Sequence, residues 1–308
     1  MIKHQLALVQ REIWEHRSIW ITPAAVAFVL TFLAIAMVIM AAAFGEAFNP
    51  EIEKIADATV PDSIRRAALA GVLVGNTFAF LIAMWFLMIF YCLDSLYAER
   101  KDKSILFWKS LPVSDLQIVT SKLVTGAAVI PAVTLVVFFF TAIASYLIGG
   151  ITIALSGSSA ILAAGPGAIL DTTLLFLYGF VVQSLWYLPV FGWLLLVSAW
   201  SRKATLLWAI LPPWGVAALE GLIFRSDRFV DLMGERLTGV FPLAFRHGGE
   251  EIVWEGPHGK VEIEGYDGVT QLIDPGALLA SPGLYGGLVV AAVLFAGAVW
   301  LRRWRDDS

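Results

Sequence analysis

The 308-residue sequence is poor in charge: Asp, Glu, Lys and Arg make up only 15% of its residues, whereas 59% are hydrophobic. Soluble domains carry about 25% charged residues. This composition therefore excludes an ordinary soluble domain and predicts an integral membrane protein. Cysteine is almost absent as well. Cys92 is the single one, which excludes an intramolecular disulfide and argues against redox chemistry in this chain.

Motifs for catalysis are also missing. No Gly-x-x-x-x-Gly-Lys-Ser/Thr loop occurs, and in the nearest sequence Gly259-Lys260 is followed by Val261, so we expect the chain to hydrolyse no nucleotide itself. Neither a Gly-x-Ser-x-Gly elbow nor a His-Glu-x-x-His helix is present. These absences predict that the chain is not an enzyme and holds no catalytic residue, metal or cofactor. The histidines, which show no metal-ligand spacing, are His4, His16, His247 and His258.

Long apolar runs are what the sequence does contain. A helix needs about 20 apolar residues to cross a bilayer. Five uncharged runs of at least that length occur, and a sixth candidate at about 204–224 is interrupted only by Glu220. The predicted fold class is an all-α membrane protein, with residues 1–308 forming a single transmembrane domain. The expected spans cover residues 19–44, 70–95, 115–148, 171–199, 204–225 and 284–302.

Lys and Arg are distributed unevenly between the two sides that six spans define. The N-terminus, residues 96–114, the turn at Arg202-Lys203 and the C-terminal tail share one side, which holds most of the basic residues. Basic residues favour the cytoplasmic side of a membrane, so we expect both termini to be cytoplasmic. The opposite side holds most of the acidic residues, which we interpret as a solvated outer surface.

Residues 1–18 are predicted to form an amphipathic helix. Ile2, Leu6, Val9 and Ile13 recur at helical spacing, with charged residues between them. A helix with this pattern lies at a membrane surface, and we expect it at the inner surface, directly before the first span.

Residues 226–283, between spans five and six, are predicted to form a small extracytoplasmic α+β subdomain. Within this segment, two strand-like runs at 252–254 and 261–263 flank Gly256-Pro257-His258-Gly259. Two such runs joined by a short loop with glycine indicate a β-hairpin.

Residues 96–114 contain an apolar cluster at 105–108 that is too short to cross a membrane. Pro112 disfavours helix at Leu111, while Ser114 and Gln117 have the spacing of a capping box. We therefore predict a separate short helix at 103–111, with span three beginning at 115. Such a helix can lie in the headgroup layer, pack under its own bundle or insert into a partner protein. We favour the partner, because two long helices would hold the short one rigidly.

Polar residues are sparse within the spans. Burying a charge in lipid costs a few kcal/mol, so each charged residue in a span is a functional candidate. Asp94 and Asp171 lie near span ends, where water or headgroups can solvate them. Two consecutive prolines remove two backbone donors from span five, and we expect them to break or sharply kink it. The candidates for a pathway or gating role are Asn76, Gln183, Pro212, Pro213 and Glu220.

Residues 93–114, LDSLYAERKDKSILFWKSLPVS, resemble the permease subunit of ATP-binding cassette (ABC) exporters of the type-2 permease family. In that family, a stretch with a Glu-Arg pair and a later Leu-Pro-Val/Ile-Ser sequence follows span two and begins the coupling helix. The resemblance implies that the helix at 103–111 seats in a groove of an ATPase subunit, with Phe107 and Trp108 pointing at that partner. The residues that it assigns to ATPase coupling are Glu99, Arg100, Ser104, Ile105, Phe107, Trp108, Lys109, Leu111, Pro112, Arg202 and Lys203.

The same resemblance implies the partners. Two separately encoded ATPase subunits would hold ATP and Mg, and a second permease subunit, identical or homologous, would contact spans one, two and five. Membrane lipid surrounds such an assembly, and no nucleic acid takes part in it.

The predicted function is therefore a permease subunit of an ABC exporter in the bacterial inner membrane. It would couple ATP hydrolysis on a separate subunit to movement of a substrate across or out of the membrane. An alternative is a non-transporting assembly or anchor protein whose external segment binds an envelope partner. A third hypothesis is a secondary transporter in which Glu220 carries a proton. It is disfavoured because no second buried ionisable group pairs with Glu220 and no inverted repeat is visible.

Overall fold

The computed structural model describes residues 2–44, 62–110, 113–155, 167–246, 250–256, 259–265 and 269–304. Within these ranges, six helical segments are long and apolar enough to cross a membrane, as predicted. Five of them are single helices and one is a continuous series of three. They are α2 (Ser18–Phe44), α4 (Asp62–Lys101), the series α6 (Asp115–Val124), η2 (Thr125–Val129) and α7 (Ile130–Leu155), then α9 (Gly167–Trp186), α11 (Thr205–Phe224) and α16 (Pro282–Trp304).

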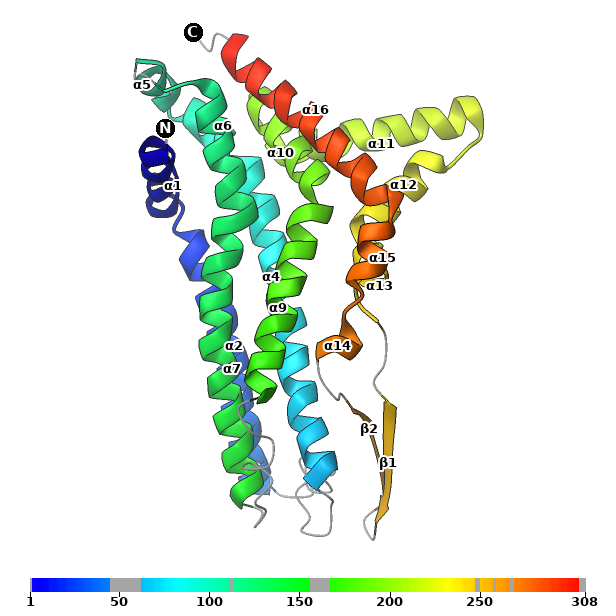
Figure 1. The fold of residues 1–308 in the computed structure, drawn as a ribbon. Coiled ribbons are helices and arrows are strands. Elements are labelled where there is room, and N and C mark those ends of the chain that lie inside the picture. Colours follow the sequence, from blue (N-terminus) through cyan, green and yellow to red (C-terminus); the bar gives the residue numbers. More distant parts are fainter. Residues whose placement is uncertain are drawn as a thin grey trace.

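The helices α2, α4, α7 and α9 pack side by side as one elongated bundle (Figure 1). The N-terminal helix α1 (Ile2–Glu15), the short helix α5 (Ser104–Ser110) and the end of α16 lie together at one end of this bundle. The β-strands lie at the opposite end. The described residues nearest the two ends of the chain thus lie at the same end of the bundle.

The third span contains a π-helical turn, η2, that the sequence analysis did not predict. Its cause is Pro131, which has no N–H and so cannot bond to the carbonyl four residues earlier. That carbonyl belongs to Ala127, and it accepts a hydrogen bond from the Ser184 hydroxyl of α9 at 2.8 Å instead. The widened turn therefore also joins span three to α9.

The span predicted at 171–199 is not one helix. α9 ends at Trp186 and α10 (Leu188–Trp200) begins after Tyr187, with Pro189 in its first turn. A proline is tolerated there but cannot continue the preceding helix. The indole of Trp186 and the hydroxyl of Tyr187 donate to the carbonyls of Arg236 and Leu237, at 2.9 and 2.8 Å. The break between α9 and α10 is thereby held against α12 (Arg228–Thr238).

The expected break in span five is wrong, because α11 continues through Pro212 and Pro213. The carbonyl that Pro213 leaves without its helical donor belongs to Ala209. It accepts a hydrogen bond from the Trp193 indole of α10 at 3.0 Å, which compensates for the lost donor. In Figure 1, α11 runs across the direction of the long helices and away from them. Ala209 is its one buried residue.

The segment predicted as an external subdomain contains both helices and strands. β1 (Glu250–Gly256) and β2 (Gly259–Gly265) pair antiparallel, with Ile252 opposite Ile263, which is the hairpin expected there. Of the described parts of this segment, the hairpin reaches the end of the molecule opposite α5, whereas the short helices lie alongside the bundle (Figure 1). They are α12, α13 (Val240–Ala244), α14 (Val269–Leu272) and α15 (Pro275–Ala280).

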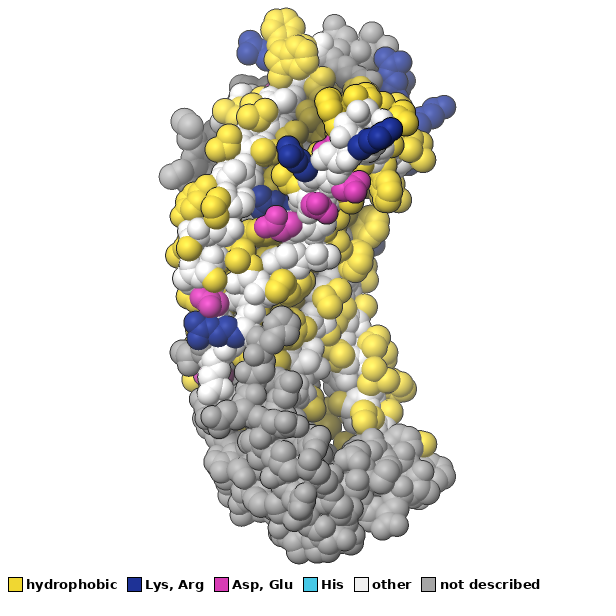
Figure 2. All heavy atoms as spheres, turned by 90° about the vertical axis from the view of Figure 1, so that its right-hand side faces the viewer, with side chains coloured by type: hydrophobic (Ala, Val, Ile, Leu, Met, Phe, Trp, Pro, Cys, Tyr) yellow, Lys and Arg dark blue, Asp and Glu magenta, His cyan; other side chains and the backbone are white. Residues whose placement is uncertain are grey.

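Apolar side chains predominate on the described part of the face shown in Figure 2, which includes α11 and α12, and charged side chains form a few groups there. α2 and α11 are the least buried of the six candidate spans. α16, in contrast, packs closely along α10 at Gly192. A Cβ atom added at Gly192 would lie 3.2 Å from Leu294 Cβ and 3.3 Å from the Ala291 carbonyl oxygen. The absence of a side chain thus lets the two helices approach each other.

We predict that Gly192→Leu destabilises the protein, because the added side chain meets the backbone of α16. Overpacking of this kind costs about 1–3 kcal/mol, and the melting temperature of the detergent-solubilised chain should fall. Gly286→Leu is the matched control on α16, where an added Cβ meets nothing within 4 Å, and it should change stability by less than about 0.5 kcal/mol. Equal melting temperatures for the two variants would contradict the close packing of α10 and α16.

Candidate functional site

Buried charges from four helices meet at the end of the bundle that holds α5. Glu12 of α1, Glu99 of α4, Lys122 of α6 and Arg302 of α16 are each between 1% and 4% exposed, and we call these four residues the charge cluster. The Lys122 ammonium lies 2.9 Å from a Glu12 oxygen and 3.0 Å from a Glu99 oxygen. The Arg302 guanidinium lies 2.7 Å from the other Glu99 oxygen. Glu99 therefore has a cation on each side.

Less buried neighbours complete the charge cluster. Arg11 lies 3.6 Å from Glu99, and Asp115 lies 3.2 Å from Arg302. The Tyr91 hydroxyl donates to Glu12 at 2.8 Å. Arg11 also pairs with Glu15 at 2.6 Å, so every carboxylate of the group has a cation beside it. Removing an ion from water costs several kcal/mol, and only good pairing offsets that cost.

Glu99 and Arg100 are consecutive, yet they bind different helices. Glu99 pairs with α6 and α16, whereas the Arg100 guanidinium donates to the carbonyls of Ser198 and Ser201 at the C-terminus of α10. A cation at this position also interacts favourably with the helix dipole. The Ser198 hydroxyl in turn accepts from two backbone N–H groups of α4, at 3.1 and 2.9 Å. The last turn of α4 is thus fixed to three other helices.

The short helix α5 follows this turn directly and occupies the position predicted for it. Lys103, with a φ of 56°, turns the chain between α4 and α5. The Ser104 hydroxyl bonds back to the Glu99 carbonyl at 3.3 Å. The capping box at the start of α6 is confirmed: the Ser114 side chain accepts from the Gln117 backbone, and the Gln117 side chain accepts from the Ser114 backbone.

The side chains of α5 are divided between the bundle and the outside. Ile105 is buried, and the Trp108 ring lies 3.7 Å from the Arg11 guanidinium, which is a cation–π contact with α1. Phe107 is 59% exposed and meets the Trp108 ring edge-on, at 5.3 Å between centroids. Of the two rings expected to point at a partner, only Phe107 projects outward, because Trp108 packs against Arg11.

The remaining residues assigned to coupling are placed as follows. Lys109 belongs to α5, and Leu111 and Pro112 lie outside the described residues. Arg202 and Lys203 are exposed in the turn between α10 and α11, next to the Ser201 carbonyl that Arg100 binds.

The helix α1 turns one face toward the protein and the other away from it. Glu12 and Leu8 are buried, whereas Leu6 is 63% exposed and Trp14 is 74% exposed. The helix therefore turns a carboxylate toward the protein and apolar side chains away from it. Pairing of Glu12 with Lys122 explains this orientation, since the exposed apolar residues can meet lipid but an inward-facing carboxylate needs a cation.

The residues proposed for a pathway or gate are not brought together. The side-chain amide of Asn76 donates to the Ser145 hydroxyl at 2.9 Å, and that of Gln183 donates to the Leu81 carbonyl at 3.2 Å. Both bonds join neighbouring helices. Pro212 and Pro213 lie within α11, as described above.

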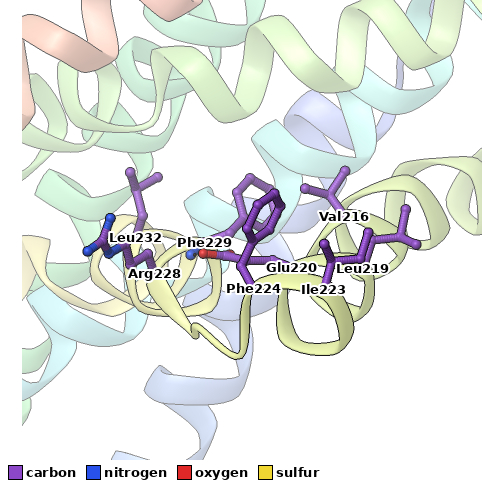
Figure 3. A pocket seen from close by; sticks show the side chains of 8 residues that line it. All are labelled: Val216, Leu219, Glu220, Ile223, Phe224, Arg228, Phe229 and Leu232. Atoms are coloured by element: carbon purple, nitrogen blue, oxygen red, sulfur yellow. Dashed lines mark hydrogen bonds between the residues drawn. The ribbon is translucent and has the colours of Figure 1, made fainter.

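Glu220 lies between α11 and α12, beside an apolar cavity of about 530 Å³ (Figure 3). Its carboxylate accepts from the Phe229 backbone N–H at 2.8 Å, in the first turn of α12. A negative charge at a helix N-terminus is stabilising. Glu220 therefore has a structural role in joining α11 to α12.

We predict that Lys122→Met strongly destabilises the protein, because it leaves Glu12 and Glu99 without their shared cation. Breaking a buried pair on one side costs about 3–5 kcal/mol, and thermal unfolding of the purified chain would show this loss. Lys101→Met, at an exposed position on α4, is the matched control and should cost less than about 0.5 kcal/mol. The double variant Glu12→Gln/Lys122→Met should recover part of the loss. Equal unfolding of the Lys122 and Lys101 variants would show that the charge cluster does not stabilise the fold.

Comparison with known proteins covers part of this site, since Glu12 and Arg302 lie outside the matched residues. Residues 67–198, which contain α5 and most of α4 and α10, match the family model described as ABC-2 family transporter protein. Neither a curated protein nor a solved structure matches the chain. This match covers less than half of the chain, and together with the six apolar helical segments it supports a multi-pass transmembrane transporter component. It confirms the resemblance seen in residues 93–114 and supports the identification of the chain as an ABC-2 type permease.

Proposed function

We propose that this chain is the transmembrane subunit of an ATP-driven exporter in the bacterial inner membrane, with both termini cytoplasmic. Two ATPase subunits, each with ATP and Mg²⁺, would bind at the end of the bundle that holds α5. The observation that carries the proposal is the mounting of this helix. α5 follows a turn that Glu99 and Arg100 fix to three other helices, and Phe107 faces outward from it.

The geometry supports a mechanical route for coupling. A force applied to α5 by an ATPase would reach the last turn of α4. Glu99 would pass it to Lys122 and Arg302, and Arg100 would pass it to the end of α10. Packed elements move as discrete bodies rather than deforming continuously, so α4, α6, α10 and α16 would move together at this end. The chain supplies no catalytic group to this sequence, since ATP hydrolysis takes place on the partner.

We predict that Phe107→Asp abolishes coupling without disturbing the fold. A carboxylate buried in the apolar contact with the ATPase weakens the binding free energy by more than about 1.4 kcal/mol. Co-purification of an ABC ATPase from native membranes should therefore fall more than tenfold. Ile105 is unsuitable for this test because it is buried. Phe107→Leu should retain the ATPase, and Trp304→Asp, at an exposed position on α16, provides the control for added charge. An unchanged yield of ATPase with Phe107→Asp would contradict the coupling role of α5 and favour a membrane anchor.

The proposed second permease subunit would contact α2 and α11. These are the two least buried candidate spans, and α11 projects from the bundle (Figure 1). A lone chain would leave this apolar helix without protein neighbours over most of its length. A homologous subunit packed on the same face would cover it.

We predict that single cysteines on α11 cross-link two chains. In a Cys92→Ala background, Trp214→Cys and Leu222→Cys, at positions 70% and 81% exposed, should form dimers when membranes are treated with copper phenanthroline. Leu147→Cys on α7, at a position 54% exposed, is the control and should remain monomeric on a non-reducing gel. Equal dimer formation at all three positions would indicate random collision and contradict this interface.

A further inference from the structure

A cavity of about 670 Å³ opens beside the charge cluster, where the α1–α2 junction, α4 and the start of α11 meet. Its size lies within the range of about 300–1,000 Å³ that is usual for small-molecule sites. Thr22 of α2 and Thr205 of α11 both line it. The cavity thus draws on three candidate spans.

One wall of the cavity is a stripe along α4 made of Phe86, Phe90 and Asp94, which we call the 86–94 stripe. Residues four apart lie on the same face of a helix, so the two rings and the carboxylate follow one another along the cavity. Phe86 is 49% exposed and Phe90 is 55% exposed. Their rings are therefore accessible, and aromatic faces attract cations.

The carboxylate of Asp94 is exposed and forms no hydrogen bond or ion pair with the residues that the structure describes. Near the end of the span, water or headgroups can solvate this carboxylate, and a cation can replace them. At Asp94 the cavity leaves room for such a cation to come from outside the chain.

The other ionisable side chains in the cavity do not compete for this role. His16 lines it, and burial lowers the pKa of the imidazole, so His16 is neutral at neutral pH. The Tyr91 hydroxyl already donates to Glu12. Among the described residues that line the cavity there is no Lys or Arg. The lining thus combines one negative charge with accessible rings.

We infer that this cavity binds an amphipathic organic cation, with the positive group at Asp94 and the apolar part against Phe86 and Phe90. A bare metal cation does not fit, because it requires several converging oxygen ligands and Asp94 supplies the single carboxylate of the lining. That the cation is a transported substrate rests on the proposed function. Binding itself does not depend on an ATPase.

The test uses tetraphenylphosphonium as the probe and the full chain in nanodiscs, with equilibrium binding measured against empty nanodiscs. We expect saturable binding to the unmodified chain and a Kd at least about tenfold weaker for Asp94→Asn, because the charge partner is lost. Asp171→Asn, which removes a carboxylate outside this cavity, should leave the Kd unchanged. Phe86→Ala/Phe90→Ala should also weaken binding, and neutral triphenylphosphine oxide should bind weakly to every variant.

Absence of saturable binding to the unmodified chain, or equal Kd values for Asp94→Asn and Asp171→Asn, would overturn the inference. Melting temperatures of the variants show whether each one is folded, and Asp94→Asn should melt normally because the carboxylate is exposed and unbonded. Co-purification of the ATPase is measured on the same variants. If the ATPase co-purifies but Asp94→Asn does not change the Kd of the probe, the inference is wrong and the proposed function stands. If the Kd changes as expected but no ATPase co-purifies, the proposed function is wrong and the binding site stands.

Discussion

The carboxylate of Glu99 is buried where α1, α4, α6 and α16 meet, and it is stable there only because Lys122 and Arg302 approach it from two sides. Arg302 comes from a position 203 residues farther along the chain. An unpaired ion at such a site would be strongly unfavourable, so the four helices are held in one arrangement at this end. The adjacent Arg100 adds the C-terminus of α10 to the same assembly. The position of α5 depends on these contacts, because α5 begins four residues after Arg100.

The helix α4 connects three features that would otherwise be separate. The 86–94 stripe lines the cavity, Glu99 and Arg100 follow one to two turns later, and α5 with its exposed Phe107 comes directly afterwards. A ligand at the stripe and a protein at α5 would therefore act on the same rigid helix. This arrangement gives a physical route by which occupancy of the cavity and the position of an ATPase could influence each other, since both would bias one two-state movement.

Local sequence patterns predicted local structure well. The Ser114–Gln117 capping box, the short helix before it, the six apolar helical segments and the hairpin around Ile252 and Ile263 are all present. Each depends on residues close together in the chain. The errors arose where a distant residue decided the outcome. Span five continues through two prolines because Trp193 satisfies a freed carbonyl. The burial of Glu12 on α1, which the sequence analysis did not address, likewise depends on its pairing with the distant Lys122. The sequence does not show which residues pair in the charge cluster, because they lie far apart in the chain. The positions of Lys122 and Arg302 beside apolar spans did indicate that these cations need acidic partners.

The central claim is that Glu99 fixes the position of α5 relative to α6 and α16, and a distance measurement tests it most directly. Spin labels at Phe107→Cys on α5 and Trp304→Cys on α16, in a Cys92→Ala background, occupy exposed positions. Double electron–electron resonance should give one narrow distance distribution for this chain. Glu99→Gln should broaden that distribution, because α5 loses its connection to Arg302 and Lys122. A distribution that stays equally narrow in the Glu99 variant would contradict the account.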